Sequence, residues 1–383
     1  MKVIKNGVVF ANGVFQDKVD VILHEGKILG FAHCLDSFNG EVINAEGGYV
    51  LPGLIDIHTH GIHGHDTMEG SQDALLNIAK HYVKYGITSF LPTTVTASAI
   101  DVNRSVAAIS QLSMSYTGGS VILGCHLEGP FIRPEYRGAH SLDYIADCGL
   151  DYHHQMVGVL EKEVRLVTLS PELEGAEAFI RYLKGKGIAV SCGHSGATYE
   201  EMERAIEWGV SHVTHLFNGM VSLHHREPGV IGSALNHPEV TVEMIADLIH
   251  LHPAILQLIV KAKGFEKCVL VSDSMAATGL GDGEYNLGVQ KVFVKDGQAR
   301  LKEGNLAGST LTLDRAVKNM IEVVGIPPEQ VIPMASENPA KVIGEDHRRG
   351  KIARGYEGDI CIMDREWNVM KALVGGQILY SRI

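Results

Sequence analysis

Eight short apolar segments run through the middle of this chain, and each is followed by an amphipathic helical pattern. The expected strands span residues 54–57, 87–91, 121–127, 164–169, 188–192, 212–214, 241–245 and 268–272. The intervening helices carry boundary signals: Thr198 and Glu201 have the spacing of a capping box, and Pro253 stands at a helix start. Strands that alternate with helices in this way, over roughly 250 residues, predict an α/β fold, a TIM-type (β/α)8 barrel.

Both ends of the chain have a different pattern, with short β-branched runs separated by turns such as Asn-Gly and Glu-Gly. We expect residues 1–50 and 350–383 to form one small β-sandwich domain built from the two termini. Residues 51–349 would then form the barrel. A β-rich insert at residues 285–301 is expected in the loop after the eighth barrel strand.

The charge and cysteine content limit the partners and the compartment. A net charge of −12 and an isoelectric point near 5.9 argue against nucleic acid or an anionic membrane as the main partner, although a local Arg and His cluster can still bind an anionic substrate. The six cysteines include no Cys-x-x-Cys pair, which is typical of reduced cytosolic thiols. No apolar stretch reaches about 18 residues, so we expect no membrane span and a cytoplasmic location.

Side chains that suit a metal ion stand at the ends of several expected strands. His58 and His60 close the first strand and point to the same side of it, because strand side chains alternate. Four further strands end in Glu128, His194, His215 and Asp273. An isolated His at a strand end is more often structural, and a lone Asp is usually a helix cap. Here a purely structural role would have to apply independently at all six positions. Imidazole and carboxylate bind zinc, iron and related divalent ions, so the sequence predicts a metal-dependent hydrolase.

Several motifs surround these positions. They include PGLIDIHTH at 52–60, HLEGPF at 126–131, GHS at 193–195, THLFNGM at 214–220, HHREPG at 224–229, SDSM at 272–275 and LAGS at 306–309. Through them the chain resembles the amidohydrolase superfamily, and more closely the N-acetylglucosamine-6-phosphate deacetylase family, over nearly its whole length. Dihydroorotase-like relatives carry a carboxylated lysine at the end of strand 4. This chain has no lysine there, at residues 167–171, so Glu128 is the natural carboxylate ligand.

The resemblance implies a centre of one or two divalent ions, zinc or iron. Glu128, His194 and His215 would hold the main ion, and His58 and His60 would hold or share a second. Asp273 would take a proton from the attacking water and pass it to the departing amine, while His140 would donate a hydrogen bond to the acetyl oxygen. The expected reaction converts N-acetyl-D-glucosamine 6-phosphate into D-glucosamine 6-phosphate and acetate.

The same resemblance implies how a phosphorylated amino sugar is bound. The phosphate site would contain Asn218, Gly219, His225, Arg226 and His250, and the sugar pocket would contain Ala139, Leu306, Ala307 and Gly308. A homodimer is expected, in which Arg226 and His225 serve either their own site or that of the partner subunit.

Three other functions stay open. An N-acetylgalactosamine-6-phosphate deacetylase acts on a substrate that differs in one hydroxyl configuration, which the sequence does not resolve. An amidohydrolase acting on a cyclic amide or N-acyl amino acid is disfavoured by the missing strand-4 lysine and by the block around Arg226. A non-catalytic scaffold barrel is disfavoured because all six metal and acid/base positions are filled.

Overall fold

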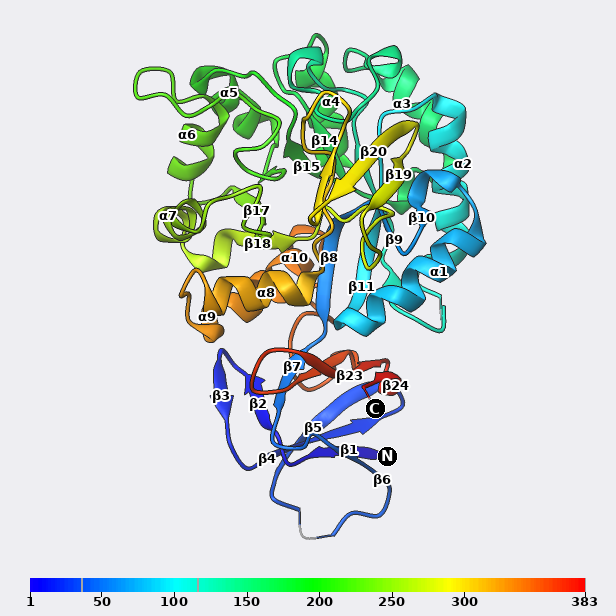
Figure 1. Cartoon of the computed structure of the whole chain (residues 1–383), viewed down its shortest axis with the longest axis vertical. Helices are drawn as coiled ribbons and strands as arrows, with labels where there is room; N and C mark the ends of the chain where they lie inside the picture. Colours follow the sequence, from blue (N-terminus) through cyan, green and yellow to red (C-terminus); the bar gives the residue numbers. More distant parts are fainter. Residues whose placement is uncertain (36, 116, 383) are drawn as a thin grey trace.

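The computed structural model describes residues 1–35, 37–115 and 117–382. Its largest part is a nearly closed barrel of parallel strands, which confirms the predicted (β/α)8 fold (Figure 1). The barrel strands are β8 (Leu54–Thr59), β11 (Ile87–Thr94), β12 (Val121–Ile122), β13 (Cys125–Glu128), β14 (Val164–Leu169), β15 (Ala189–Cys192), β16 (His212–Val213), β17 (Thr241–Ile245) and β18 (Cys268–Val271).

The third barrel strand is broken, so the single strand predicted at 121–127 is wrong in this respect. β12 and β13 both pair with β11, where Ser89 lies opposite Val121 and Thr93 lies opposite His126. Between the two pieces Gly124 has a φ of 134°, a conformation that glycine adopts readily and other residues rarely do. A Cβ atom there would also lie 2.5 Å from the Glu163 carbonyl oxygen, so the break depends on glycine.

Helices surround the barrel and bury an apolar face against its strands (Figure 1). They are α1 (Gln72–Tyr82), α2 (Ala99–Leu112), α3 (Leu150–Val157), α4 (Ala176–Gly185), α5 (Tyr199–Trp208), α6 (Gly229–Asn236), α7 (Pro253–Lys263), α8 (Leu313–Glu322), α9 (Pro328–Met334) and α10 (Glu337–Val342). The predicted boundary signals are confirmed, since Thr198 and Glu201 form a capping box at the start of α5 and Pro253 begins α7.

The first and last barrel strands are joined at their carboxyl ends. The Asp273 N–H donates to the His58 carbonyl at 2.9 Å, and the His60 N–H donates to the Ser274 carbonyl at 2.8 Å. These bonds bring the end of β8 against the segment that follows β18. The strand-end side chains of both segments therefore meet at one rim of the barrel.

The two ends of the chain form sheets beside the barrel, and both termini lie there (Figure 1). One sheet has the order β5 (Lys27–His33), β4 (Val19–His24), β1 (Lys2–Lys5), β6 (Glu41–Asn44), and the other has β24 (Gln377–Ser381), β23 (Val369–Val374), β22 (Ile360–Met363), β7 (Tyr49–Pro52), β2 (Val8–Ala11), β3 (Val14–Gln16). A separate apolar cluster, which includes Val21, Ile362 and Leu373, joins residues of the two sheets. We propose on this basis that residues 1–50 and 350–383 form one domain and residues 51–349 the other.

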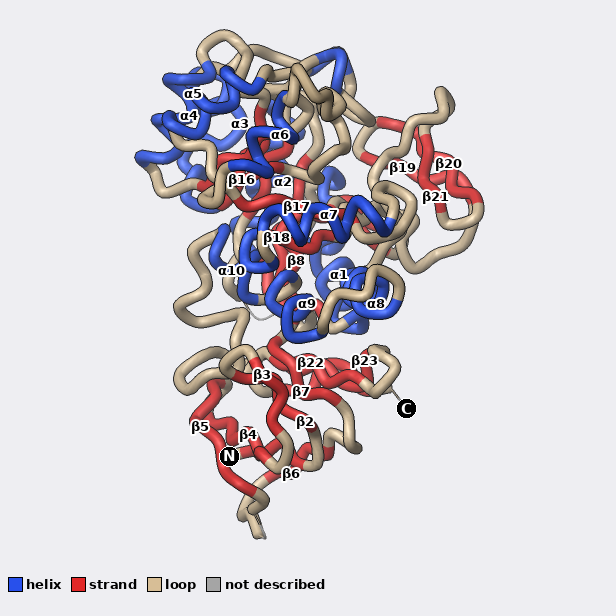
Figure 2. The backbone as a smooth tube through the Cα atoms, turned by 90° about the vertical axis from the view of Figure 1, so that its left-hand side faces the viewer, coloured by secondary structure: helices blue, strands red, loops and turns tan. Residues whose placement is uncertain are grey.

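A three-stranded antiparallel insert follows β18. It consists of β19 (Gly283–Leu287), β20 (Gln290–Lys295) and β21 (Gln298–Arg300), close to the predicted range of 285–301. The insert stands out from one side of the barrel (Figure 2). Its β19–β20 turn is held by Asp66 of the short pair β9 (Gly61–Ile62) and β10 (His65–Asp66), because an Asp66 carboxylate oxygen accepts from the Gly288 N–H at 3.0 Å.

In the described part of the chain, no helix combines the length and the apolar character needed to cross a bilayer.

The barrel core should carry most of the stability of this fold. Phe90 on β11 is completely buried, with its ring centroid 4.9 Å from that of Tyr82. We expect Phe90→Ala to lower the free energy of unfolding by about 3–5 kcal/mol, because it leaves a cavity in a close-packed interior. Phe293 on the insert is 41% exposed, and Phe293→Ala should change stability by about 0.5 kcal/mol or less. Urea unfolding followed by circular dichroism measures both; equal losses would contradict this assignment of the core.

Candidate metal centre and substrate pocket

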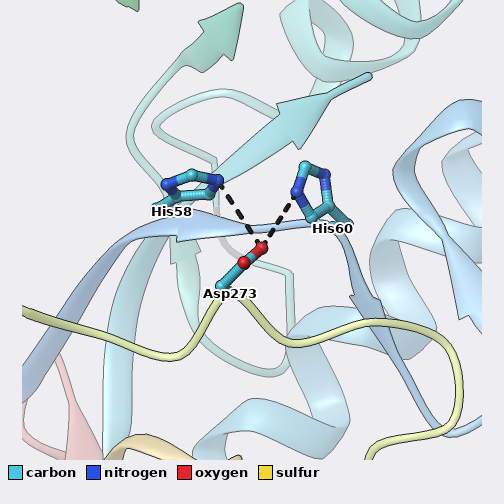
Figure 3. Close-up of side chains that lie close together, drawn as sticks. All are labelled: His58, His60 and Asp273. Atoms are coloured by element: carbon cyan, nitrogen blue, oxygen red, sulfur yellow. Dashed lines mark ion pairs between the residues drawn. The ribbon is translucent and has the colours of Figure 1, made fainter. Parts of the chain in front are cut away.

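Two groups of metal-suited side chains gather at the carboxyl-terminal rim of the barrel. One group is His58, His60 and Asp273, and the other is Glu128, His194 and His215; within each, the ligand atoms lie within 4.8 Å of one another. All six residues are buried. Figure 3 shows His58 and His60 turned towards Asp273, whose Oδ1 lies 3.6 Å and 3.2 Å from their Nε2 atoms. The structure thus brings together all the metal and acid/base residues predicted at strand ends.

The Glu128 carboxylate lies between the two groups. Its Oε1 is 3.1 Å from His194 Nε2, 3.2 Å from His215 Nε2 and 3.4 Å from His58 Nε2. Its Oε2 is 3.3 Å from His60 Nε2. One carboxylate therefore faces the Nε2 atoms of all four histidines predicted as metal ligands, which come from three different strand ends.

The hydrogen bond that each ring makes at Nδ1 determines whether its Nε2 atom is a donor or an acceptor. The Nδ1 atoms of His60, His194 and His215 lie 3.2, 2.7 and 3.0 Å from backbone carbonyl oxygens, and His58 Nδ1 lies 2.9 Å from a Glu243 carboxylate oxygen. Because those oxygens only accept, each Nδ1 carries a proton and donates it. In the neutral form of each of these four rings, Nε2 then carries a lone pair, and this lone pair points at a carboxylate. A cluster made only of acceptors fits a divalent cation at its centre.

The charges in the site also favour a cation. Burial alone would lower the pKa of His60, but its contacts with Asp273 and Glu128 raise that pKa to about 9, which shows that the two carboxylates stabilise positive charge at Nε2, either a proton or a metal ion in its place. Burial would raise the pKa of Glu128, yet the neighbouring imidazoles hold it well below its usual range. The pKa of Asp273 is lowered in the same way, against burial, by His58 and His60. Both carboxylates are therefore ionised at neutral pH and attract positive charge.

Three of the six residues in these two groups have an unusual backbone. His194, His215 and Asp273 have φ values of 54°, 28° and 49°, in the left-handed region that side chains other than glycine rarely adopt. Such a conformation costs on the order of 1–3 kcal/mol and persists only where the surroundings enforce it. Hydrogen bonds to the backbone supply that restraint, for example from the Ser309 N–H to the Asp273 carbonyl at 2.7 Å.

His140 has the opposite tautomer from the four ligand histidines. The Thr96 N–H donates to His140 Nδ1 at 3.1 Å, so this nitrogen is an acceptor and the proton resides on Nε2. That Nε2 lies 3.4 Å from Glu128 Oε2, at the edge of the ligand cluster. Burial lowers the pKa of His140 to about 4, so the ring is neutral at pH 7. It therefore presents a fixed N–H donor beside a cluster of acceptors.

A cavity of about 520 Å³ opens above these groups and is large enough for a small ligand. Six of the predicted substrate-binding residues line it: Ala139, Asn218, Gly219, His250, Leu306 and Gly308. Ala307 is buried next to the lining. His225 and Arg226 are exposed and do not line the cavity of their own chain.

Several residues at this site were not predicted. Thr96 sets the tautomer of His140, and Leu287 and Arg300 of the insert line the cavity. Glu243 on β17 contacts His58 from behind. A lone carboxylate inside the apolar run of β17 was the one signal that could have revealed Glu243, whereas the contacts of Thr96 and of the insert depend on loop conformations.

The model for the Amidohydrolase family matches residues 49–379, and the chain therefore belongs to the amidohydrolase family, whose members are metal-dependent. It is 37% identical to N-acetylglucosamine-6-phosphate deacetylase of Vibrio furnissii, with 87% of this chain and 83% of the relative covered. It is 36% identical to N-acetylgalactosamine-6-phosphate deacetylase of Escherichia coli O157:H7, with 88% and 89% covered. The crystal structure of N-acetylglucosamine-6-phosphate deacetylase from Pasteurella multocida matches with a TM-score of 0.94 and 29% identity, over 100% of both chains.

Removing the central carboxylate should disrupt metal binding. We expect Glu128→Gln to weaken zinc affinity by at least about 100-fold, because the ligand cluster loses the anion that all four Nε2 atoms face. Glu135→Gln is the matched control, since Glu135 lines the same cavity but its side chain is 63% exposed. Metal content after dialysis, measured by mass spectrometry, compares the two. Equal metal content in both variants would contradict a centre built on Glu128.

Proposed function

We propose that this protein is a deacetylase that hydrolyses N-acetyl-D-glucosamine 6-phosphate to D-glucosamine 6-phosphate and acetate. The observation that carries the proposal is the pairing of a buried acceptor cluster with the His140 N–H donor in one cavity. Amide hydrolysis needs both, since water must be activated on one side and the carbonyl oxygen stabilised on the other. The similarity to deacetylases of phosphorylated amino sugars supports the choice of substrate.

The metal centre proposed here holds one or two divalent ions, zinc or iron. Glu128, His194 and His215 would hold the first ion, with His58 and His60 holding or sharing the second. A divalent ion at this position lowers the pKa of water towards roughly 7 and polarises the amide carbonyl. The all-acceptor arrangement of the described ligand atoms supports this assignment.

Asp273 and His140 would carry the proton and charge movements. The neighbouring imidazoles lower the pKa of Asp273 and so keep its carboxylate ionised, and in that form it would accept a proton from the attacking water. It would return that proton to the amine nitrogen as the carbon–nitrogen bond breaks. His140 Nε2–H would donate to the acetyl oxygen as negative charge develops there.

The sugar phosphate would extend along the cavity away from the ligand cluster. Asn218, Gly219 and His250 line that cavity and would contact the phosphate, and Ala139 and Leu306 line it as well and would contact the sugar. The His250 ring is fixed by Asp247, whose Oδ2 lies 2.7 Å from Nδ1. Arg226 is exposed and outside its own cavity, which favours a homodimer in which it and His225 serve the partner subunit's site.

The proposed reaction is tested by acetate release from N-acetylglucosamine 6-phosphate, from its galactosamine isomer and from unphosphorylated N-acetylglucosamine. We expect metal-dependent turnover of the first and at least about 100-fold lower kcat/KM without the phosphate, because a charge-assisted contact contributes about 1.5–3 kcal/mol and the phosphate makes several. Removal of the metal by chelation should abolish turnover, and added zinc should restore it. No release from any sugar by metal-loaded protein would reject the proposal.

The galactosamine isomer is the second candidate substrate, because relatives of both specificities are about equally similar to this chain. A preference for that isomer in the same assay would transfer the protein to the sister activity and leave the chemistry of the site unchanged.

Asp273→Asn should reduce turnover by about 100- to 10,000-fold, since it removes the proton acceptor while keeping the shape of the side chain. The variant should still fold and bind at least one ion through Glu128, His194 and His215. Circular dichroism and metal content check these two points. Unchanged turnover would favour another proton acceptor.

The subunit that Arg226 serves can be decided by complementation. Arg226→Ala and Asp273→Asn should each be nearly inactive alone. In a mixed dimer, the site with an intact Asp273 would receive Arg226 from the other subunit, so co-expression of differently tagged variants should restore up to about half of the wild-type activity per mixed dimer. Purification through both tags isolates that dimer. Activity that stays at the level of the single variants would place Arg226 in its own subunit's site.

A further inference from the structure

Glu243 is a completely buried carboxylate in the middle of β17, behind the ligand cluster. Its Oε2 lies 2.9 Å from His58 Nδ1 and 3.1 Å from the His215 backbone nitrogen. Its Oε1 lies 3.1 Å from His212 Nε2. The carboxylate therefore contacts a side chain of one ligand group and the backbone of the other.

This arrangement satisfies an expensive buried charge. An ionised carboxylate in an apolar interior is tolerated only when hydrogen-bond donors surround it, and Glu243 has three. The His212 ring continues the chain of contacts outward, with its Nδ1 2.6 Å from the Thr241 hydroxyl. The Glu243 side chain is thus held from one side by His212 and directs its other oxygen at His58.

The position of the proton on His58 depends on this contact. With Glu243 in place, Nδ1 donates, and His58 Nε2 has no hydrogen-bond partner among the described residues, so its lone pair can bind a metal ion. Without an acceptor at Nδ1, the proton would move to Nε2, where Glu128 Oε1 at 3.4 Å and Asp273 Oδ1 at 3.6 Å can accept it. The ring would then present a proton where an ion has to bind.

We infer that Glu243 is a positioning residue that holds His58 in its metal-binding tautomer. The inference rests on the proposed metal-dependent function, because it assigns His58 a role as a ligand. Partners of this kind typically change metal affinity by roughly 10- to 100-fold when they are removed.

Three substitutions separate positioning from mere packing. Glu243→Leu removes both acceptors, and Glu243→Asp keeps the charge but shortens the arm by one methylene, so both should fail to reach His58. Glu243→Gln keeps a carbonyl oxygen that can accept from His58 Nδ1 and the His215 N–H, while His212 can change tautomer to accept from the amide. The glutamine variant should therefore rescue what leucine and aspartate lose.

The readout is zinc titration of the metal-free proteins in competition with a chromophoric chelator, together with their thermal unfolding. We expect two sites in the wild type, the weaker of which loses roughly 10- to 100-fold in affinity in the leucine and aspartate variants. The stronger site should change by less than about 3-fold, and Glu243→Gln should stay within about 3-fold at both sites. Glu345→Leu is the matched control, since Glu345 is also buried, pairs with Arg348 and lies outside the cavity.

The outcomes distinguish this inference from the proposed function. Equal weakening of both sites in step with lower thermal stability, or a glutamine variant as weak as leucine, would overturn the positioning role. A wild type that binds a single ion and still releases acetate would overturn it as well, while leaving the deacetylase proposal intact. A wild type that neither binds zinc nor releases acetate would reject both. If the leucine variant fails to fold, the aspartate and glutamine variants still decide the question.

Discussion

The structure of the site depends on the crowding of imidazole lone pairs around one buried carboxylate. Glu128 faces the Nε2 atoms of His58, His60, His194 and His215 at 3.1–3.4 Å, and the Nδ1 of each of these rings donates to an acceptor. Acceptors that converge in a buried space repel one another unless a cation or extra protons lie between them. The barrel keeps them there because the ligands sit on separate strand ends whose positions the barrel core fixes.

The fold and most of the metal-suited residues could be predicted from the sequence because their signals are local. Strand spacing gave the barrel, and parallel strands place their carboxyl-terminal residues on one rim, so His58, Glu128, His194, His215 and Asp273 had to approach one another. The break at Gly124 could not be predicted, since it depends on the approach of the Glu163 carbonyl from a different segment. The same holds for Glu243, whose partners lie far away in sequence.

The tautomers of the site histidines could not be predicted from the sequence either. His140 and His194 are the same residue type in neighbouring loops, with ring centroids 4.6 Å apart. One accepts at Nδ1 from the Thr96 backbone, and the other donates at Nδ1 to the Tyr136 carbonyl. Nε2 is consequently a hydrogen-bond donor in His140 and an acceptor in His194. The loop residues that contact each ring, Thr96 and Tyr136, determine this difference, and the motifs that contain the two histidines do not encode it.

That difference places one N–H donor, on His140, at the edge of a cluster of acceptors in the same cavity. In the proposed reaction the acetyl oxygen would be drawn both to the His140 N–H and to the ion held by the acceptor cluster, because His140 Nε2 lies only 3.4 Å from Glu128 Oε2. An acetyl oxygen that faced only the ionised Glu128 and Asp273 carboxylates would be repelled by them. The proposed chemistry therefore requires one orientation of the acyl group, with its oxygen next to His140. The residues of the insert and of the loops after β16 and β17 that line the cavity would then hold the remainder of the substrate in that orientation.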